Sequence, residues 1–261
     1  MHSVFQLVIS EYPRFATAVL PQNGAVALSV TELAEEQRLR KALNACETLF
    51  PLSNDRWAGQ LWWFSWNNAV VAPAVTAMVE FYKTPSLQLD RGVLHSQPGD
   101  YWYSFSTDIV TGDGDWFQAA RDYATSITPL IDALSATAGV KPAPLWAVAA
   151  DALVAAAVSA GNESFDPYRG VRIACELSNG LSEGAVGVTI PEPRFEDIRD
   201  GTITATDMQA VAAGEEPMDV HTVARRASCC MIFHSPGCGK CLSCPKQKPE
   251  ERKAKLIAHF Q

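Results

Sequence analysis

The chain has 261 residues, 48% of them hydrophobic, and a formal charge of -8 at pH 7. A chain of this length can bury the core of one large domain or of two smaller ones. Its acidic balance excludes a dedicated nucleic-acid binder, because phosphate contacts require Lys and Arg clustered on a basic face.

Two stretches bear on where the protein resides. Residues 1–12 lack a basic segment followed by a long apolar run and a small-residue cleavage site, so we expect no export and a cytoplasmic location. The most apolar stretch, residues 143–160, is mostly alanine and contains Asp151. This composition predicts a buried helix, and we expect a protein that is not an integral membrane protein.

The first half of the chain is predicted to be helical and rich in aromatic residues. Apolar residues recur at helical spacing in residues 31–50, which predicts an amphipathic helix. Residues 56–82 continue as a helix that carries four tryptophans, with Pro73 as a kink or boundary. We therefore expect an aromatic helix face to be buried.

A change to period-two spacing predicts a β-hairpin between residues 86 and 110. Its first strand contains Leu87, Leu89 and Val93, and its second contains Tyr101, Tyr103 and Phe105. The turn is Gln97-Pro98-Gly99-Asp100. Helices are predicted again at residues 116–137 and, after a proline-rich start, at residues 142–160.

The C-terminal part has weaker signals. Residues 162–214 mix Gly, Pro and Asn with short apolar runs, so their elements are left open. Residues 221–233 are predicted to be extended, and residues 249–260 to form a short charged helix. We expect an α+β fold with a mainly helical body at residues 1–220, an antiparallel β-sheet, and a C-terminal cysteine segment at residues 221–261.

The cysteines are unevenly distributed. Cys46 and Cys175 stand alone, whereas the other five of the seven lie between positions 229 and 244. An odd number of cysteines, in a chain that is neither small nor evidently exported, does not suggest a disulfide framework. Reduced thiolates bound to a soft metal or an iron-sulfur cluster fit better.

Spacing alone leaves the metal open. Zinc ligands are usually paired two to four residues apart, and the adjacent pair Cys229-Cys230 departs from that spacing. The run Cys238-x2-Cys241-x2-Cys244-Pro245 matches three ligands of a bacterial four-iron ferredoxin site, whose fourth ligand would then be Cys229 or Cys230. An iron-sulfur cluster is therefore a firmer inference than its number of irons.

The pattern C-C-x10-C-x2-C, preceded by Arg-Arg and followed by Pro, resembles the C-terminal signature of the FhuF-type ferric-siderophore reductase family. The resemblance implies a [2Fe-2S] cluster, with Cys238 outside the pattern. It also implies one-electron reduction of Fe(III) held by a hydroxamate-type siderophore, followed by release of Fe(II) for iron assimilation. The ligands that it implies are Cys229, Cys230, Cys241 and Cys244.

Positive charge surrounds the predicted cluster. Arg225 and Arg226 are candidates for tuning the cluster or contacting substrate, and strand alternation implies that at most one of them faces it. Residues 225–255 hold eight Lys or Arg against two acids. This basicity suits an acidic electron donor such as a ferredoxin, although a solvated helix face explains it equally well.

The chain has no nucleotide-binding motif, so electrons must come from a partner, a ferredoxin or an NAD(P)H-dependent reductase.

Two further questions remain open at this level. Aromatic residues of the hairpin, Tyr101, Trp102 and Tyr103, or the helix around Trp62 are possible walls of a siderophore pocket, but a core role is more common for such residues. The competing functions are an iron-sulfur electron carrier without siderophore activity and a zinc-stabilised binding module. The large N-terminal body favours a substrate-binding enzyme over a carrier.

Overall fold

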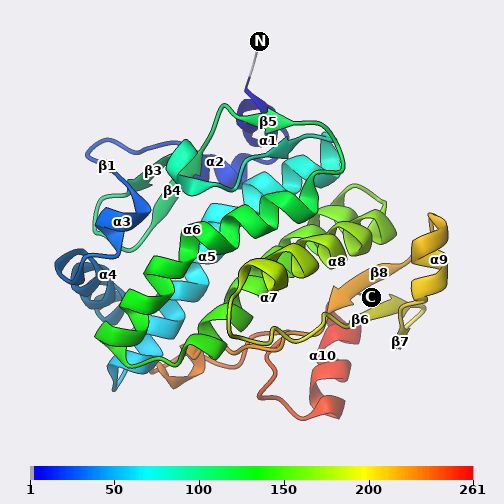
Figure 1. Cartoon of the computed structure of the whole chain (residues 1–261). Helices are drawn as coiled ribbons and strands as arrows, with labels where there is room; N and C mark the ends of the chain where they lie inside the picture. Colours follow the sequence, from blue (N-terminus) through cyan, green and yellow to red (C-terminus); the bar gives the residue numbers. More distant parts are fainter. Residues whose placement is uncertain (1–2, 261) are drawn as a thin grey trace.

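Four long helices form the body of the protein in a computed structural model that describes residues 3–260 (Figure 1). In this group α5 packs on α7, α7 on α8, and α8 on α6. Trp62, Trp63 and Trp66 are fully buried in the core between them. The predicted helices in these regions and the buried aromatic face are confirmed. The bounds are Asp55–Glu80 for α5, Trp116–Ala138 for α6, Pro142–Glu163 for α7 and Pro167–Gly184 for α8.

Helix α5 passes through Pro73 without ending, so a boundary at this residue is wrong. Proline removes one backbone hydrogen bond from a helix interior. Here the residues on both sides of Pro73 are buried in the core, and the apolar packing of a 26-residue helix offsets that loss. Tertiary packing overrides the local signal.

Helix α8 occupies part of the region whose elements the sequence left open. Its glycines serve close packing and do not interrupt the helix. A Cβ atom on Gly170 would lie 2.6 Å from the carbonyl oxygen of Ala157, and one on Gly161 would lie 2.8 Å from the Cα atom of Gly170. These two glycines therefore let the backbones of α7 and α8 approach each other.

The N-terminal segment covers one side of the body. The helix predicted at residues 31–50 is divided in two, because Glu35 is extended and caps the second helix. Ser29 begins the first helix with a capping box in which its side chain and that of Glu32 bond each other's backbone N–H. The elements are α1 (Val4–Glu11), a 3-10 turn (Pro13–Phe15), α2 (Ala16–Val19), β1 (Val26–Leu28), α3 (Val30–Leu33) and α4 (Glu36–Leu49).

The predicted hairpin is present but shorter than expected. Strands β3 (Val93–Ser96) and β4 (Tyr103–Ser106) pair antiparallel, and β1 joins β3 to give the order β1-β3-β4. Gly99 and Asp100 adopt the positive φ angles that the turn requires. Leu87 and Leu89 lie outside the strand, Leu89 in a 3-10 turn (Leu89–Arg91). Strands β2 (Thr84–Pro85) and β5 (Val110–Thr111) form a separate short pair.

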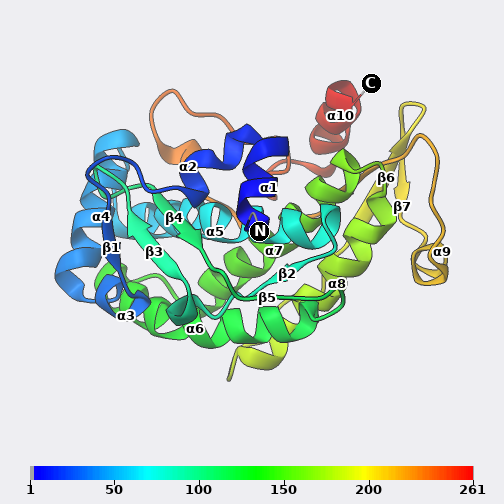
Figure 2. The ribbon, with the colours of Figure 1, turned by 90° about the horizontal axis from the view of Figure 1, so that it is seen from above.

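A second antiparallel sheet lies at the other end of the helical body (Figure 2). Its order is β7-β6-β8, with β6 at Phe195–Arg199, β7 at Thr202–Ala205 and β8 at His221–Ala224. Helix α9 (Met208–Ala213) connects β7 towards β8. The extended stretch predicted for residues 221–233 is correct only to Ala224, after which an irregular loop contains a 3-10 turn (Ile232–His234). Helix α10 (Pro249–Phe260) ends the chain as predicted, and the fold is α+β.

Helix α7 is long and apolar enough to cross a membrane by length and composition, and it is the one such helix among residues 3–260. Of its most apolar window, 67% is buried inside the protein, between α5 and α8. It is a core helix, as predicted for residues 143–160.

Candidate metal centre

The cysteine loop follows β8 and runs past the ends of α5 and α7, drawn in orange in Figure 1. Two contacts from α5 hold it. The side-chain amide of Gln60 donates to the carbonyl oxygen of Cys229 at 2.7 Å, and the ring of Trp57 stacks on that of His234 at 3.6 Å between centroids. The loop is therefore attached to a long helix whose residues are mostly buried in the core.

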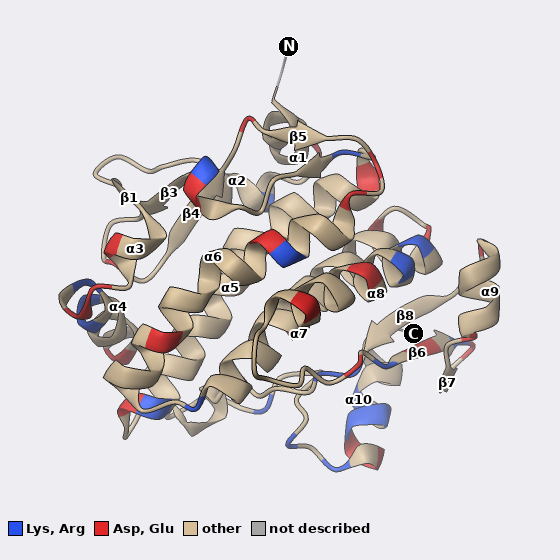
Figure 3. Cartoon of the chain, in the orientation of Figure 1, with Lys and Arg blue, Asp and Glu red and all other residues tan. Residues whose placement is uncertain are grey.

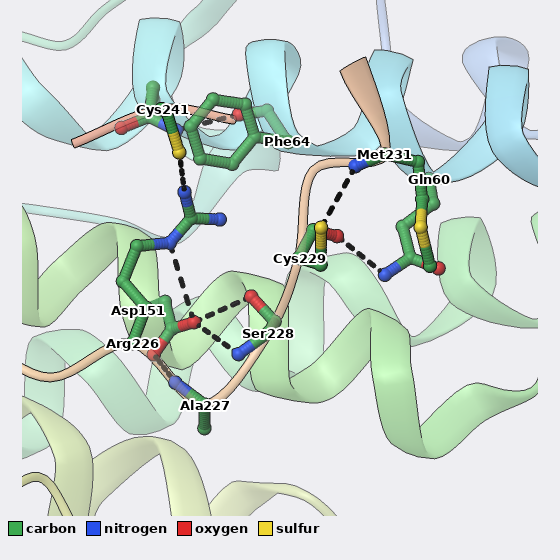
Figure 4. A network of polar contacts seen from close by, with 10 residues as sticks. Gln60, Phe64, Asp151, Arg226, Ala227, Ser228, Cys229, Met231 and Cys241 are labelled. Atoms are coloured by element: carbon green, nitrogen blue, oxygen red, sulfur yellow. Dashed lines mark hydrogen bonds and ion pairs between the residues drawn. The ribbon is translucent and has the colours of Figure 1, made fainter. Parts of the chain in front are cut away.

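Asp151 of α7 holds the start of the loop (Figure 4). One carboxylate oxygen accepts from the backbone N–H of Ala227 at 3.0 Å. The other accepts from the N–H and the hydroxyl of Ser228 at 2.7 and 2.5 Å. Burial raises the pKa of Asp151, and the bonds from Ser228 and Ala227 and the charge of Arg226 oppose that rise. A buried carboxylate thus fixes the backbone immediately before the cysteine pair.

The thiols of the cysteine loop lie against one another. The proximity of Cys229 and Cys241 lowers the pKa of Cys230, and the proximity of Cys230 raises the pKa values of Cys229 and Cys241. Cys244 is close enough for its charge to raise the pKa values of Cys229 and Cys241. These four cysteines are therefore near neighbours in the loop.

Backbone geometry adds donors around these sulfur atoms. Met231 has a φ of 64°, in the left-handed region, and its N–H donates to the Sγ of Cys229 at 3.4 Å. The N–H of Ile232 donates to Cys230 and contributes to its lowered pKa. Such donors offset the negative charge of thiolate ligands and raise the potential of an iron-sulfur cluster.

The two arginines before the cysteines point in different directions. The guanidinium of Arg226 lies 3.7 Å from the Sγ of Cys241 and 4.5 Å from the ring centroid of Phe64 (Figure 4). It also lies 3.8 Å from the carboxylate of Asp151. Arg225 instead approaches Glu196 of β6 at 3.9 Å. Arg226 is the arginine that the structure brings to the cysteines.

The donor set fits an iron-sulfur cluster. Soft thiolates select zinc, copper(I) or iron-sulfur clusters over hard cations. Within residues 3–260, no three His, Cys, Asp or Glu side chains converge as closely as a single metal ion would require. The fit therefore rests on the thiolate chemistry of Cys229, Cys230, Cys241 and Cys244.

Other residues singled out in the sequence lie elsewhere. Cys46 is buried in the body, and burial, with the charge of Glu47, raises its pKa to about 12. Cys238 is partly exposed, and its backbone N–H bonds Ser235. Tyr101, Tyr103 and Trp62 are buried core residues, whereas the side chain of Trp102 is 52% exposed on the hairpin.

Sequence reasoning did not find Asp151, Gln60 or Phe64 as parts of this site. The sequence did contain a signal for Asp151, which is a single acid inside a long alanine-rich helix. A buried carboxylate in such a helix needs a hydrogen-bonding or charged partner. Nothing local pointed to Gln60 or Phe64, since their partners lie more than 150 positions away in the chain.

Comparison with known families agrees with this geometry. Residues 226–246 match the family described as FhuF 2Fe-2S C-terminal domain. No curated protein matches the chain. The matched segment contains Cys229, Cys230, Cys241 and Cys244, so the resemblance to the FhuF-type family is confirmed there and the domain indicates a [2Fe-2S] cluster.

Proposed function

We propose that this protein is a ferric-siderophore reductase that holds its [2Fe-2S] cluster on Cys229, Cys230, Cys241 and Cys244. The observation that carries this proposal is a loop that buries Cys229, Cys230 and Cys244 and that places the guanidinium of Arg226 3.7 Å from the Sγ of Cys241. The match of this segment to a 2Fe-2S domain supports it. The substrate is Fe(III) bound by a siderophore of the hydroxamate type.

The chain's own residues prepare the site for electron transfer. When bound, a [2Fe-2S] cluster accepts and donates single electrons. Arg226 and the N–H groups of Met231 and Ile232 offset negative charge at the sulfur atoms. Asp151 and Gln60 hold the loop, so a change of charge requires little movement of the backbone. Fe(III) that gains one electron becomes Fe(II), which hydroxamate oxygens bind more weakly and release.

The electron donor is a separate protein, a ferredoxin or an NAD(P)H-dependent reductase, in the cytoplasm. Exposed lysines of the cysteine loop and α10, drawn in blue in Figure 3, support an acidic docking partner. Lys240, Lys246, Lys248, Lys253 and Lys255 are all exposed there. In this proposal residues 221–261 carry the cluster, and residues 1–220 form the body that takes part in siderophore binding.

The test is a single-turnover experiment on anaerobically purified protein. Dithionite reduction should bleach the visible absorption and produce the electron paramagnetic resonance signal of a reduced [2Fe-2S] cluster. Adding a ferric trihydroxamate should remove that signal and yield one Fe(II) per cluster. A cluster that stays reduced would indicate a simple electron carrier, and a colourless, zinc-containing protein would indicate a structural module; either result refutes the proposal.

A further inference from the structure

A hollow of about 490 Å³ lies between α7, β8 and α10, against the cysteine loop. Its volume is in the range of small-molecule sites. Residues of α7, β8, the cysteine loop and the C-terminal part of α10 line it, together with Arg226. Its lining residues include Ala155, Ser159, Arg226, Leu242, Ser243 and Phe260.

This hollow adjoins the accessible side of the cysteines. Leu242 and Ser243 line it and are the two residues between Cys241 and Cys244. Cys241 is partly exposed, whereas Cys229, Cys230 and Cys244 are buried. Arg226 also lines the hollow and contacts the Sγ of Cys241 at 3.7 Å. Two residues that line the hollow therefore adjoin Cys241, Arg226 through its contact with the sulfur and Leu242 as the next residue of the chain.

The charges on its walls are compensated from within the protein. The guanidinium of Arg226 lies 3.8 Å from the carboxylate of Asp151, and the carboxylate of Glu163 forms an ion pair with Arg14. Burial, and then the charge of His259, lowers the pKa of His221, which keeps that ring neutral near pH 7. The side chains that line the hollow, with one acid in Glu163 and one base in Arg226, therefore carry no net formal charge that would attract a highly charged ligand.

The remaining lining combines apolar surface with hydroxyl groups. The ring of Phe260 stacks on that of His221 at 3.7 Å between centroids, and both rings line the hollow. Leu256 anchors α10 beneath it and is almost fully buried. Aliphatic and amide groups of a chelate can pack on such a surface, while Ser159 and Ser243 offer hydrogen bonds.

We propose that this hollow between α7, β8 and α10 is the docking site of the ferric siderophore, and that it selects uncharged complexes. This inference rests on the proposed function. Three hydroxamates balance the charge of Fe(III) and give a neutral complex, whereas three catecholates give a trianion. The neutral complex suits the compensated walls, and Arg226 connects this hollow to the sulfur of Cys241.

The test measures binding without electron transfer. Gallium(III) forms redox-inert complexes of the same shape, so a gallium trihydroxamate can be titrated into the holoprotein by tryptophan fluorescence. Ala155→Trp and Ser159→Trp fill the hollow from α7, and Ala143→Trp adds the same bulk at an exposed position at the start of α7. We expect the Kd to rise at least about tenfold in both pocket variants and to stay unchanged in the control.

Cluster integrity and substrate charge are checked in parallel. Visible absorption and oxidation of the reduced cluster by ferricyanide should match wild type in all three variants. A gallium tricatecholate should bind wild type at least about tenfold more weakly than the trihydroxamate.

The outcomes separate the two proposals. Wild-type Kd values in both pocket variants would overturn the docking site while leaving the reductase function intact. Equal affinity for the two gallium complexes would overturn the selection by charge. If the reduced wild-type cluster is not reoxidised by a ferric trihydroxamate, the proposed function fails, and the docking site fails with it.

Discussion

Replacing Asp151 by Ala should release the start of the cysteine loop while the helical body remains folded. The buried Ser228 loses the acceptor for both its N–H and its hydroxyl, and each unsatisfied group costs about 1–3 kcal/mol. Ala227 is exposed, so water can replace the bond to its N–H. Because burial raises the pKa of Asp151, removing the carboxylate also relieves a desolvation cost. The net effect is a loss of about 3 kcal/mol in the free energy that favours the closed loop over the open one.

A loss of about 3 kcal/mol raises the open population of the loop about a hundredfold. If opening precedes attack by an iron chelator, the visible absorption of the cluster should bleach about a hundred times faster than in wild type. Asp151→Asn keeps one acceptor oxygen and should fall between the two. Asp132→Ala, at an exposed carboxylate on α6, is the matched control and should bleach at the wild-type rate.

Two results would refute this reasoning. Bleaching of Asp151→Ala within about threefold of wild type would mean that the carboxylate does not hold the loop. Loss of the helical circular dichroism signal in the same variant would mean that the loop and the helical body unfold together, as one cooperative unit.

Three further predictions follow from individual side chains. Cys238→Ser should keep the [2Fe-2S] absorption and resonance signal, because Cys238 is partly exposed and does not belong to the four cysteines that shift one another's pKa values. Lys246→Glu should slow reduction by an acidic ferredoxin several-fold at low ionic strength and weaken its salt dependence, whereas Lys83→Glu, just beyond the far end of α5, should not. His221 should make stability depend on pH. Its pKa is lowered in the fold from 6.5, so its contribution is present above about pH 6.5 and is lost as the pH falls below that value. In urea unfolding, His221→Gln should reduce the difference in free energy between about pH 7.5 and pH 5.5.

Each of these has a contrary result. Loss of the cluster in Cys238→Ser would favour the four-iron alternative. Equal rates for the two lysine variants would remove the cysteine loop as the donor's docking surface. An unchanged pH difference in His221→Gln would mean that other groups control acid sensitivity.

The sequence by itself determined most of the long helices and the chemistry of the cluster. Helical periodicity and tryptophan spacing are local properties, and they predicted α5, α6, α7 and α10 to within a few residues. The cysteine spacing is equally local, because two thiols separated by two residues can turn inward on one short loop. The sequence therefore predicted an iron-sulfur centre, and the domain match at residues 226–246 confirmed the expected cofactor.

Tertiary structure alone decided which residues support that centre. Asp151 meets Ser228 across 77 positions, and Gln60 meets Cys229 across 169. Such contacts depend on how α5 and α7 pack, which no local pattern encodes. Packing likewise kept α5 continuous through Pro73 and brought α7 and α8 together at Gly161 and Gly170. The physical reason is that burial and steric fit between distant segments outweigh local preferences of a few kcal/mol.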